Sequence, residues 1–487
     1  MDYQLPADCL TEILEYLEKD KNTLYSCLLV DHLWCGVSVR ILWRNIWNLD
    51  YKSYRHQKEV SSAILRTLIA CLPNESKEIL YENNLFISTP NGSNPTLFNY
   101  VTFCKVLSID EICRMITDFL IPKKISRHLS NYITWFIANE IIKMFMKQIF
   151  SLKQLTYLDE SVDYYSFKLP FTFFSEAKDN LVNLTELQCR SDINSEFYSQ
   201  LSQICHKLQS LTVKFVPKHF PSELKELISL QKNLKNLTLF IHDEEDWKNI
   251  ISVLMKHSNT LRKLYLYSNI YLPLSFLASF LNLQEIKLSF KLLFDSFELQ
   301  HATFPKLKIL KIPHICFRSE YIMTFLENNG KNLEVIYFPK HNNALSLTIA
   351  ELCPNLRKLF IVFNENELDI LRIIFDNCQY LESLKIWRGD NLFLRGKDLL
   401  EIIAFHSPKN FYELKIINDH SNLGLFLEDL DTFFLNWKNR ISKKQINLII
   451  IDKHYYNRFN TIKLIKYYKN LGFIEIRGED NVDNDDE

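Results

Sequence analysis

Residues 378–386 read Cys-Gln-Tyr-Leu-Glu-Ser-Leu-Lys-Ile, with apolar side chains at Leu381, Leu384 and Ile386. The last two of these are separated by a single residue. Side chains alternate between the two faces of a strand, so Leu384 and Ile386 point to the same side. Leu381 fills the turn that precedes them. The stretch therefore predicts a turn followed by a short strand with one buried face.

The same Leu-x-x-Leu-x-Leu unit returns along the chain at steps of 24, 26, 27, 22, 24, 26, 23, 25 and 30 residues. The ten units begin at Leu184, Leu208, Leu234, Leu261, Leu283, Leu307, Leu333, Leu356, Leu381 and Phe411. A looser copy begins at Leu152, residues 446–451 offer a further strand, and residues 471–476 close the array. A plain amphipathic helix would space its leucines by three and four without this longer return. The pattern favours repeats, each of which buries its apolar face against its neighbours.

Three units extend to Cys-x-x-Leu, because Cys205, Cys353 and Cys378 stand three residues before the first leucine. With its unit length, the pattern resembles a leucine-rich repeat of the helix-containing class, in the cysteine-containing form commonly joined to F-boxes. The resemblance implies an α/β solenoid over residues 151–476, with parallel strands on the concave face and helices, such as 197–208 and 246–256, on the convex face. Residues 477–487 form an acidic tail with almost no apolar content and are predicted to be disordered.

The first 44 residues follow a helical period instead. One helix face carries Leu10, Ile13, Leu14 and Leu17, and Pro6 suits the first turn. Asn22 or Thr23 can cap a second helix, and Asp31 can cap a third. Three short helices bury too little area to be firmly stable alone. We therefore expect a partner to cover part of this apolar surface.

The order and spacing of residues 1–44 resemble the F-box. The matching residues are Leu5-Pro6, Leu10, Ile13-Leu14, Tyr16-Leu17, Val30, Trp34 and Leu42-Trp43. The chain departs from the family at Asp31-His32, where Cys-Lys or Ser-Lys is common, and at Leu28, where a basic residue is common. The resemblance implies docking to the Skp-type adaptor of a cullin-RING ubiquitin ligase. The adaptor-binding residues that it implies are Leu5, Pro6, Leu10, Ile13, Leu14, Leu17, Leu28, Val30, Trp34, Leu42 and Trp43. The alternative is an ordinary three-helix cap on the repeats.

Residues 45–150 are interpreted as a helical linker that grades into the solenoid, with helical periodicity in 45–80 and 105–150. Residues 89–95 read Thr-Pro-Asn-Gly-Ser-Asn-Pro and predict an exposed loop. The most apolar long stretch, residues 132–150, contains Glu140, Lys143 and Lys147. These charges predict a buried helix rather than a membrane span.

The residues just before and just after the third apolar position of each unit should point outward from the concave sheet. Over ten units, six of them are Lys or Arg, none is Asp or Glu, and six are aromatic. The candidate target-binding residues are Lys214, Phe240, Tyr265, Tyr267, Lys287, Lys311, Tyr337, Phe360, Lys385, Trp387 and Lys415. Such a surface suits a protein target with acidic or phosphorylated segments. Two alternatives stay open: the aromatic rings only cover one another, or the sheet binds nucleic acid.

Composition narrows the function further. With 57 basic and 58 acidic residues the net charge is -1, so bulk attraction to nucleic acid does not follow. The eleven cysteines are scattered singly, which favours small buried hydrophobes in a reducing compartment over metal ligands. An export signal is not expected at the N-terminus, and no phosphate-binding or hydrolase motif occurs. The acidic run 242–246 should open a helix, where carboxylates are favoured.

We therefore expect a non-catalytic substrate receptor of an SCF-type ligase, without metal or cofactor, in the cytoplasm or nucleus. It would bind the Skp-type adaptor and an unidentified target protein, and no membrane. The runner-up hypothesis is a leucine-rich-repeat interaction scaffold that takes no part in ubiquitination.

Overall fold

The structure is a computed structural model. It describes residues 5–47, 54–82, 96–123, 126–158, 178–293, 297–314, 317–339, 342–362, 368–387, 396–418, 427–440, 445–452 and 474–477. The chain divides into two compact units, Met1–Leu234 and Lys235–Glu487. The turn-rich segment 89–95 and the acidic tail that begins after Arg477 lie outside the described residues, so both expectations about them stay predictions.

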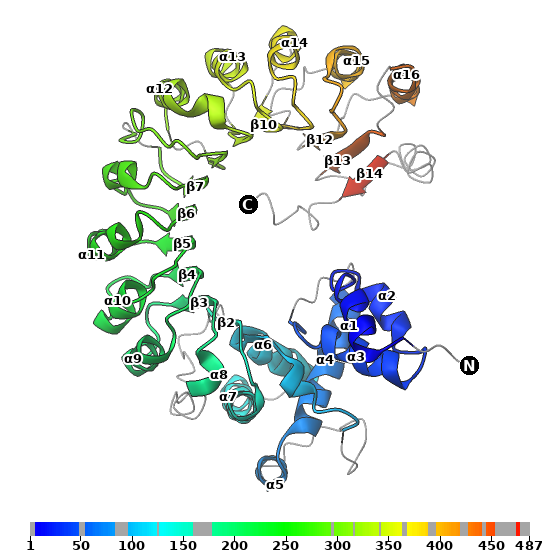
Figure 1. The fold of residues 1–487 in the computed structure, drawn as a ribbon, viewed down its shortest axis with the longest axis vertical. Helices are drawn as coiled ribbons and strands as arrows, with labels where there is room; N and C mark the ends of the chain where they lie inside the picture. The colour runs from blue at the N-terminus through cyan, green and yellow to red at the C-terminus, as the bar shows by residue number, and fades with distance from the viewer. Residues whose placement is uncertain are drawn as a thin grey trace. The chain divides into compact units, whose positions relative to one another are not determined.

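The first unit begins with helices and continues into repeats (Figure 1). Its helices are α1 (Ala7–Glu15), α2 (Lys21–Cys27), α3 (His32–Leu42), α4 (Tyr54–Cys71), α5 (Asn74–Glu82), α6 (Ile109–Leu120), α7 (Arg127–Gln148), α8 (Lys178–Leu181), α9 (Ser195–Ile204) and α10 (Ser222–Ser229). Its strands are β1 (Val106–Ser108), β2 (Gln154–Tyr157), β3 (Glu186–Arg190) and β4 (Ser210–Lys214). They pair in parallel and in chain order, as in the registers Leu107 with Leu155 and Leu187 with Leu211.

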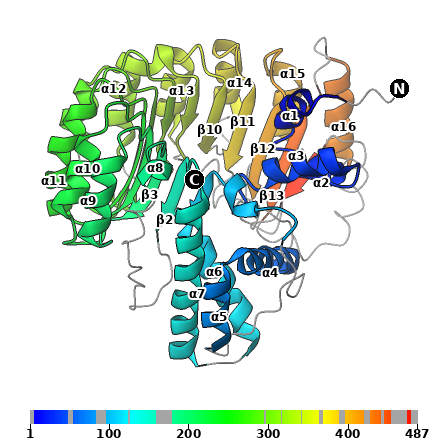
Figure 2. The same ribbon diagram turned by 60° about the horizontal axis from the view of Figure 1, so that its bottom comes forward.

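The second unit consists of repeats in which strands lie on the inner side and α-helices on the outer side (Figures 1 and 2). The strands are β5 (Asn236–Ile241), β6 (Lys263–Ser268), β7 (Glu285–Phe290), β8 (Ile309–Lys311), β9 (Val335–Tyr337), β10 (Lys358–Val362), β11 (Ser383–Trp387), β12 (Glu413–Asn418), β13 (Asn447–Asp452) and β14 (Ile474–Arg477). The helices are α11 (Glu244–Leu254), α12 (Ser319–Asn329), α13 (Asn343–Leu352), α14 (Leu368–Asn377), α15 (Gly396–His406) and α16 (Leu427–Lys438).

One backbone arrangement recurs at the start of the strands. A carbonyl of one repeat accepts hydrogen bonds from two successive N–H groups of the next. The Glu334 carbonyl, for example, accepts from the N–H of Arg357 at 2.7 Å and of Lys358 at 3.0 Å. The Arg357 carbonyl then accepts from Glu382 at 2.8 Å and Ser383 at 3.0 Å. This shared carbonyl fixes the register between neighbours, so equivalent side chains of successive repeats lie side by side.

The predicted repeats are confirmed, because each of the ten strands β3 to β12 begins two residues after the leucine or phenylalanine that opens its unit. The α/β solenoid class is confirmed with them. The predicted helices 197–208 and 246–256 correspond to α9 and α11, each shifted toward its N-terminus. The sequence reasoning missed β1, which lies inside the stretch interpreted as a linker and pairs with β2.

Two local predictions have different outcomes. Asp31 caps α3 as predicted, since its carboxylate accepts from the N–H of Trp34 at 2.8 Å. The prediction that Asn22 or Thr23 caps α2 is wrong. Asp20 is the cap: its Oδ1 accepts from the N–H of Thr23 at 3.1 Å and its Oδ2 from the Thr23 hydroxyl at 2.6 Å. A carboxylate that can accept two hydrogen bonds satisfies the helix end better than the neighbouring amide or hydroxyl.

The cysteines of the repeats lie in the core. Cys205, Cys353 and Cys378 are all buried, and the thiol of Cys378 donates to the carbonyl of Cys353 at 3.4 Å. Burial raises the pKa of Cys205 and of Cys378 to about 12. A thiol in such surroundings stays protonated at neutral pH and behaves as a small apolar group.

Candidate functional site

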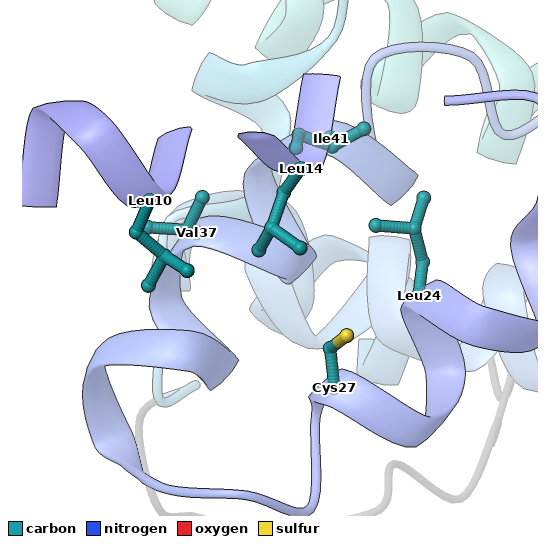
Figure 3. Packing of buried hydrophobic residues seen from close by; sticks show 6 residues of the cluster. All are labelled: Leu10, Leu14, Leu24, Cys27, Val37 and Ile41. Carbon is teal, nitrogen blue, oxygen red and sulfur yellow. The ribbon is translucent and has the colours of Figure 1, made fainter. Parts of the chain in front are cut away.

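The N-terminal module, residues 5–47, has its own small core (Figure 3). Six buried residues from α1, α2 and α3 pack together, namely Leu10, Leu14, Leu24, Cys27, Val37 and Ile41. Leu17, Trp34 and Leu42 pack against this cluster and are partly buried. An ion pair between Arg44 and Glu15, at 2.6 Å, joins the end of the module to α1. Leu10 and Leu14, which the F-box resemblance implied as adaptor contacts, therefore hold the helices together and are covered by them.

The module also exposes large apolar side chains. Ile13 is 49% exposed, Val30 59%, Leu29 89% and Tyr16 92%. Ile13 lies on α1 and Tyr16, three residues later, is its C-cap, whereas Leu29 and Val30 precede α3. We call the set Leu5, Ile13, Tyr16, Tyr25, Leu29 and Val30 the apolar patch; all six are exposed.

Sequence reasoning placed Leu5, Ile13 and Val30 of this patch among the binding residues but missed Tyr16, Tyr25 and Leu29. For Tyr16 the signal was available in the helical period, because a residue facing away from Leu10 and Leu14 must meet solvent or a partner. Pro6, also predicted, is exposed, and Leu28 is half-buried. Trp43 packs on Tyr100, with ring centroids 4.5 Å apart, so part of its surface is used inside the chain.

The end of the module continues into the sheet of the first unit. The Arg44 carbonyl accepts from the N–H of Lys105 at 2.9 Å and of Val106 at 3.2 Å. This is the shared-carbonyl arrangement that joins successive repeats. The indole N–H of Trp47 also donates to the Val106 carbonyl at 2.7 Å. The module is thus attached to β1 as a repeat would be, through backbone hydrogen bonds.

The inner face of the sheet in the second unit carries most of the predicted target-binding residues, and they contact one another. The rings of Phe240 and Tyr267 stack with centroids 4.4 Å apart and planes at 11°. Lys287 places its ammonium 5.2 Å from the Tyr267 ring centre and is only 4% exposed. The expectation that Lys287 stands in solvent is therefore wrong, because the neighbouring ring covers its charge.

A second cluster has the same design. Tyr337 and Phe360 have ring centroids 4.2 Å apart, and the Lys385 ammonium lies 5.4 Å from the first ring centre and 5.0 Å from the second. Lys385 is 7% exposed and Phe360 5%. Both were predicted to face a target. Instead, the alternative in which residues of the sheet cover one another describes this cluster. The remaining predicted residues Lys214, Lys311, Trp387 and Lys415 are half-buried.

The inner face also holds carboxylates that the sequence count left out. Each strand has a third outward position at its first residue, and Glu186, Glu285 and Glu413 occupy it. The Tyr265 hydroxyl donates to Glu285 at 2.6 Å, and Lys263 lies 3.0 Å from the same side chain. Burial, together with the neighbouring Glu285, raises the pKa of Tyr265, which therefore stays a donor. Lys415 lies 3.7 Å from Glu413. The predicted uniformly positive sheet is thus corrected to one with paired charges.

Lys385→Ala should lower the free energy of unfolding by about 1–2 kcal/mol, because a nearly buried ammonium between two rings contributes a desolvated cation–π interaction. Urea unfolding followed by fluorescence measures the change. Lys358→Ala is the matched control: this lysine is exposed on the neighbouring strand and should change stability by less than about 0.5 kcal/mol. Equal effects of the two variants would show that the rings do not stabilise Lys385.

The acidic run 242–246 has a structural role. It opens α11, where the Asp243 side chain accepts from the N–H of Glu245 at 2.9 Å. Among the residues that the structure describes, no group of three or more His, Cys, Asp or Glu side chains could hold a metal ion. A membrane-crossing helix is likewise not found within the described ranges, since none combines the needed length with sufficient apolarity.

Comparison with known proteins leaves the family of the chain open. No protein-family model matches the chain, and no curated protein matches its sequence. Among solved structures, the yeast Rad7–Elc1 complex matches with a TM-score of 0.39 and 13% identity, over 88% of this chain and 94% of that one. The leucine-rich-repeat protein LegL7 of Legionella pneumophila gives 0.29 and 13%, over 66% and 91%. An internalin of Listeria monocytogenes gives 0.28 and 12%, over 63% and 82%.

The fold is a leucine-rich-repeat solenoid. That statement rests on the geometry of the chain itself: short parallel strands in chain order, outer helices and a Leu-x-x-Leu-x-Leu unit in register. At these identities and scores the likenesses concern the fold and give no information on what this chain binds. Solenoids of this kind offer extended surfaces to protein partners, so the chain carries a protein-interaction fold.

Proposed function

We propose that the chain is the substrate-recognition subunit of an SCF-type cullin-RING ubiquitin ligase. In this proposal residues 1–44 are an F-box that binds the Skp-type adaptor, and the repeats hold a target protein. The chain performs no chemistry; it accelerates ubiquitination by holding the target beside a separate enzyme. A place in the cytoplasm or nucleus, where such ligases act, belongs to the same proposal.

The observation that carries the proposal is that the N-terminal module has a closed core and also exposes large apolar side chains. Its core is already closed by Leu10, Leu14 and their neighbours, yet Tyr16 and Leu29 remain about nine-tenths exposed. Exposed large apolar side chains grouped in so small a module indicate a protein interface. The spacing of the module is that of an F-box, so an adaptor of that class is the partner we propose.

An ordinary cap on the repeats would explain the module less well. A cap needs one apolar side, which packs on the first repeat. Here the module is joined to the first repeat by Trp47 and by the Arg44 carbonyl, which form hydrogen bonds with the segment that opens β1. The exposed apolar side chains Tyr16 and Leu29 have no such role in the described contacts. The nucleic-acid alternative loses support because Lys287 and Lys385 are buried against aromatic rings.

The test is co-purification of the full-length chain with recombinant Skp-type adaptor. The double variant Ile13→Asp, Val30→Asp should weaken adaptor binding by at least about a hundredfold, because two charges would enter a desolvated apolar interface. Both side chains are about half exposed, so the fold should tolerate the changes. Leu281→Asp is the matched control, since Leu281 is 54% exposed and lies in the second unit.

Undiminished adaptor binding by the double variant would refute the F-box assignment. If adaptor binds but cullin is never recovered with the chain, the scaffold hypothesis replaces the ligase hypothesis. The two outcomes are separate, because the first concerns the apolar patch and the second the assembly beyond the adaptor.

A further inference from the structure

A group of accessible positive charges in the second unit lies at the edge where the strands begin. A groove of about 310 Å³ crosses this edge at β8, β9 and β10. We call it the rim groove, and its side chains of interest are Lys306, Lys308, Lys331, Glu334, Arg357 and Tyr380. All of its cations are exposed, in contrast to the buried Lys287 and Lys385. The lining has four cations and a single carboxylate, although the chain as a whole is nearly neutral.

The charges in the rim groove are only partly compensated. Glu334 forms ion pairs with Lys308 at 2.7 Å and with Arg357 at 3.9 Å. Arg357 also forms an ion pair with Glu382 at 2.7 Å. Lys306 donates to the Asn282 side-chain oxygen at 2.6 Å. This oxygen belongs to a neutral amide and does not compensate the lysine charge. Within the described part of the chain, no ion pair is found for Lys331. Two lysines from adjacent repeats therefore keep their full positive charge.

The groove is held by side-chain amides that connect the repeats. Asn332 donates to the Pro305 carbonyl at 3.2 Å, and Asn355 donates to the Lys331 carbonyl at 2.8 Å. Together with Lys306 and Asn282, these contacts fix the segments that carry the cations. The segments that carry the cations belong to successive repeats, whose strands lie about 5 Å apart. Backbone segments held in this way lose less conformational freedom on binding than unfixed loops would.

We propose that the rim groove binds an extended run of acidic residues in the target protein. The row of cations extends across several repeats, so it matches carboxylates distributed along an extended chain. A single phosphate would be better served by a converging arginine fork. The only arginine of the groove, Arg357, is already engaged by Glu334 and Glu382. The inference rests on the proposed function for the identity of the partner as a ligase target.

An acidic peptide also fits the groove better than a single-stranded nucleic acid. Binding of nucleic-acid strands relies on aromatic platforms on which successive bases stack. Among the side chains that line the groove, Tyr380 is the one aromatic residue. The cations instead alternate with amides and with Glu334, an arrangement suited to carboxylates and backbone groups.

The test measures binding of a fluorescent twelve-residue peptide of alternating Asp and Gly to the full-length chain by anisotropy. The variant Lys306→Glu, Lys331→Glu should weaken binding by about tenfold or more, because two attractive pairs become repulsive. Lys256→Glu, Lys291→Glu is the matched control: both lysines are exposed, lie outside the groove, and give the same change in net charge. The control should stay within twofold of the wild type.

Three further arms decide the nature of the ligand. A peptide with Asn in place of each Asp should not bind, and a neutral peptide with one phosphoserine should bind more weakly than the acidic run. Preferred binding of a twelve-nucleotide DNA strand, or equal losses in groove and control variants, would overturn the proposal. Adaptor co-purification with the groove variant should be unchanged. If the proposed function is wrong, the wild-type chain fails to co-purify with adaptor while peptide binding is unaffected. If the groove proposal is wrong, peptide binding fails while adaptor co-purification is unaffected.

Discussion

Leu14→Asp is expected to unfold the N-terminal module. Leu14 is 1% exposed and packs with Leu10, Leu24 and Val37 (Figure 3). Loss of a buried leucine side chain costs about 2–5 kcal/mol, and burial of an unpaired carboxylate adds to that loss. Three short helices have little stability to lose. The variant should therefore abolish adaptor binding through loss of structure.

Hydrogen exchange of the full-length chain measures the effect, since amides of α1 to α3 should lose protection while those of α11 to α15 keep it. Ile13→Asp is the control from the preceding residue of the helix. Ile13 is 49% exposed, so this variant should keep its amide protection and lose only the adaptor. Retained protection in Leu14→Asp would show that Leu14 does not belong to the core. The pair separates a folding defect from an interface defect.

Asn329→Leu is expected to lower the free energy of unfolding of the second unit by about 3–5 kcal/mol. Asn329 is 1% exposed and lies at the end of α12. Its side chain accepts from the N–H of Phe304 at 2.7 Å and donates to the carbonyls of Ala302 at 2.8 Å and Phe325 at 2.9 Å. Leucine has the same branching and number of heavy atoms but takes away the partner of the Phe304 N–H and of the Ala302 carbonyl, at about 1–3 kcal/mol each.

Thermal and urea unfolding of the full-length chain test this expectation. Asn328→Leu is the matched control, because its amide makes a single exposed contact with the Thr324 carbonyl at 3.4 Å. It should change stability by less than about 1 kcal/mol. If the two variants proved equally stable, the buried amide would not connect the repeats. Gln231 makes the corresponding three hydrogen bonds in the first unit, to Leu208, Cys205 and Leu227, so its replacement provides an independent repetition.

Patterns that depend on nearby residues were predictable. The spacing of Leu381, Leu384 and Ile386 is enough to place β11, and the same pattern places its neighbours. Asp31 as a cap follows from its position before α3. The strand β1 was missed because its three residues are too few to display a period, and because its pairing with β2 depends on residues nearly fifty positions later.

The accessible surface could not be predicted in the same way. The sequence alone determined the solenoid and the positions of its strands, because these follow from local side-chain periodicity. Only the tertiary structure decided that Lys385 is covered by Tyr337 and Phe360 whereas Lys331 stays exposed at the rim. The covering rings come from other repeats, about 25 and 48 residues away in sequence. Stacking of the repeats brings these rings into contact with Lys385. A prediction that considers the outward positions of each repeat separately does not include that contact.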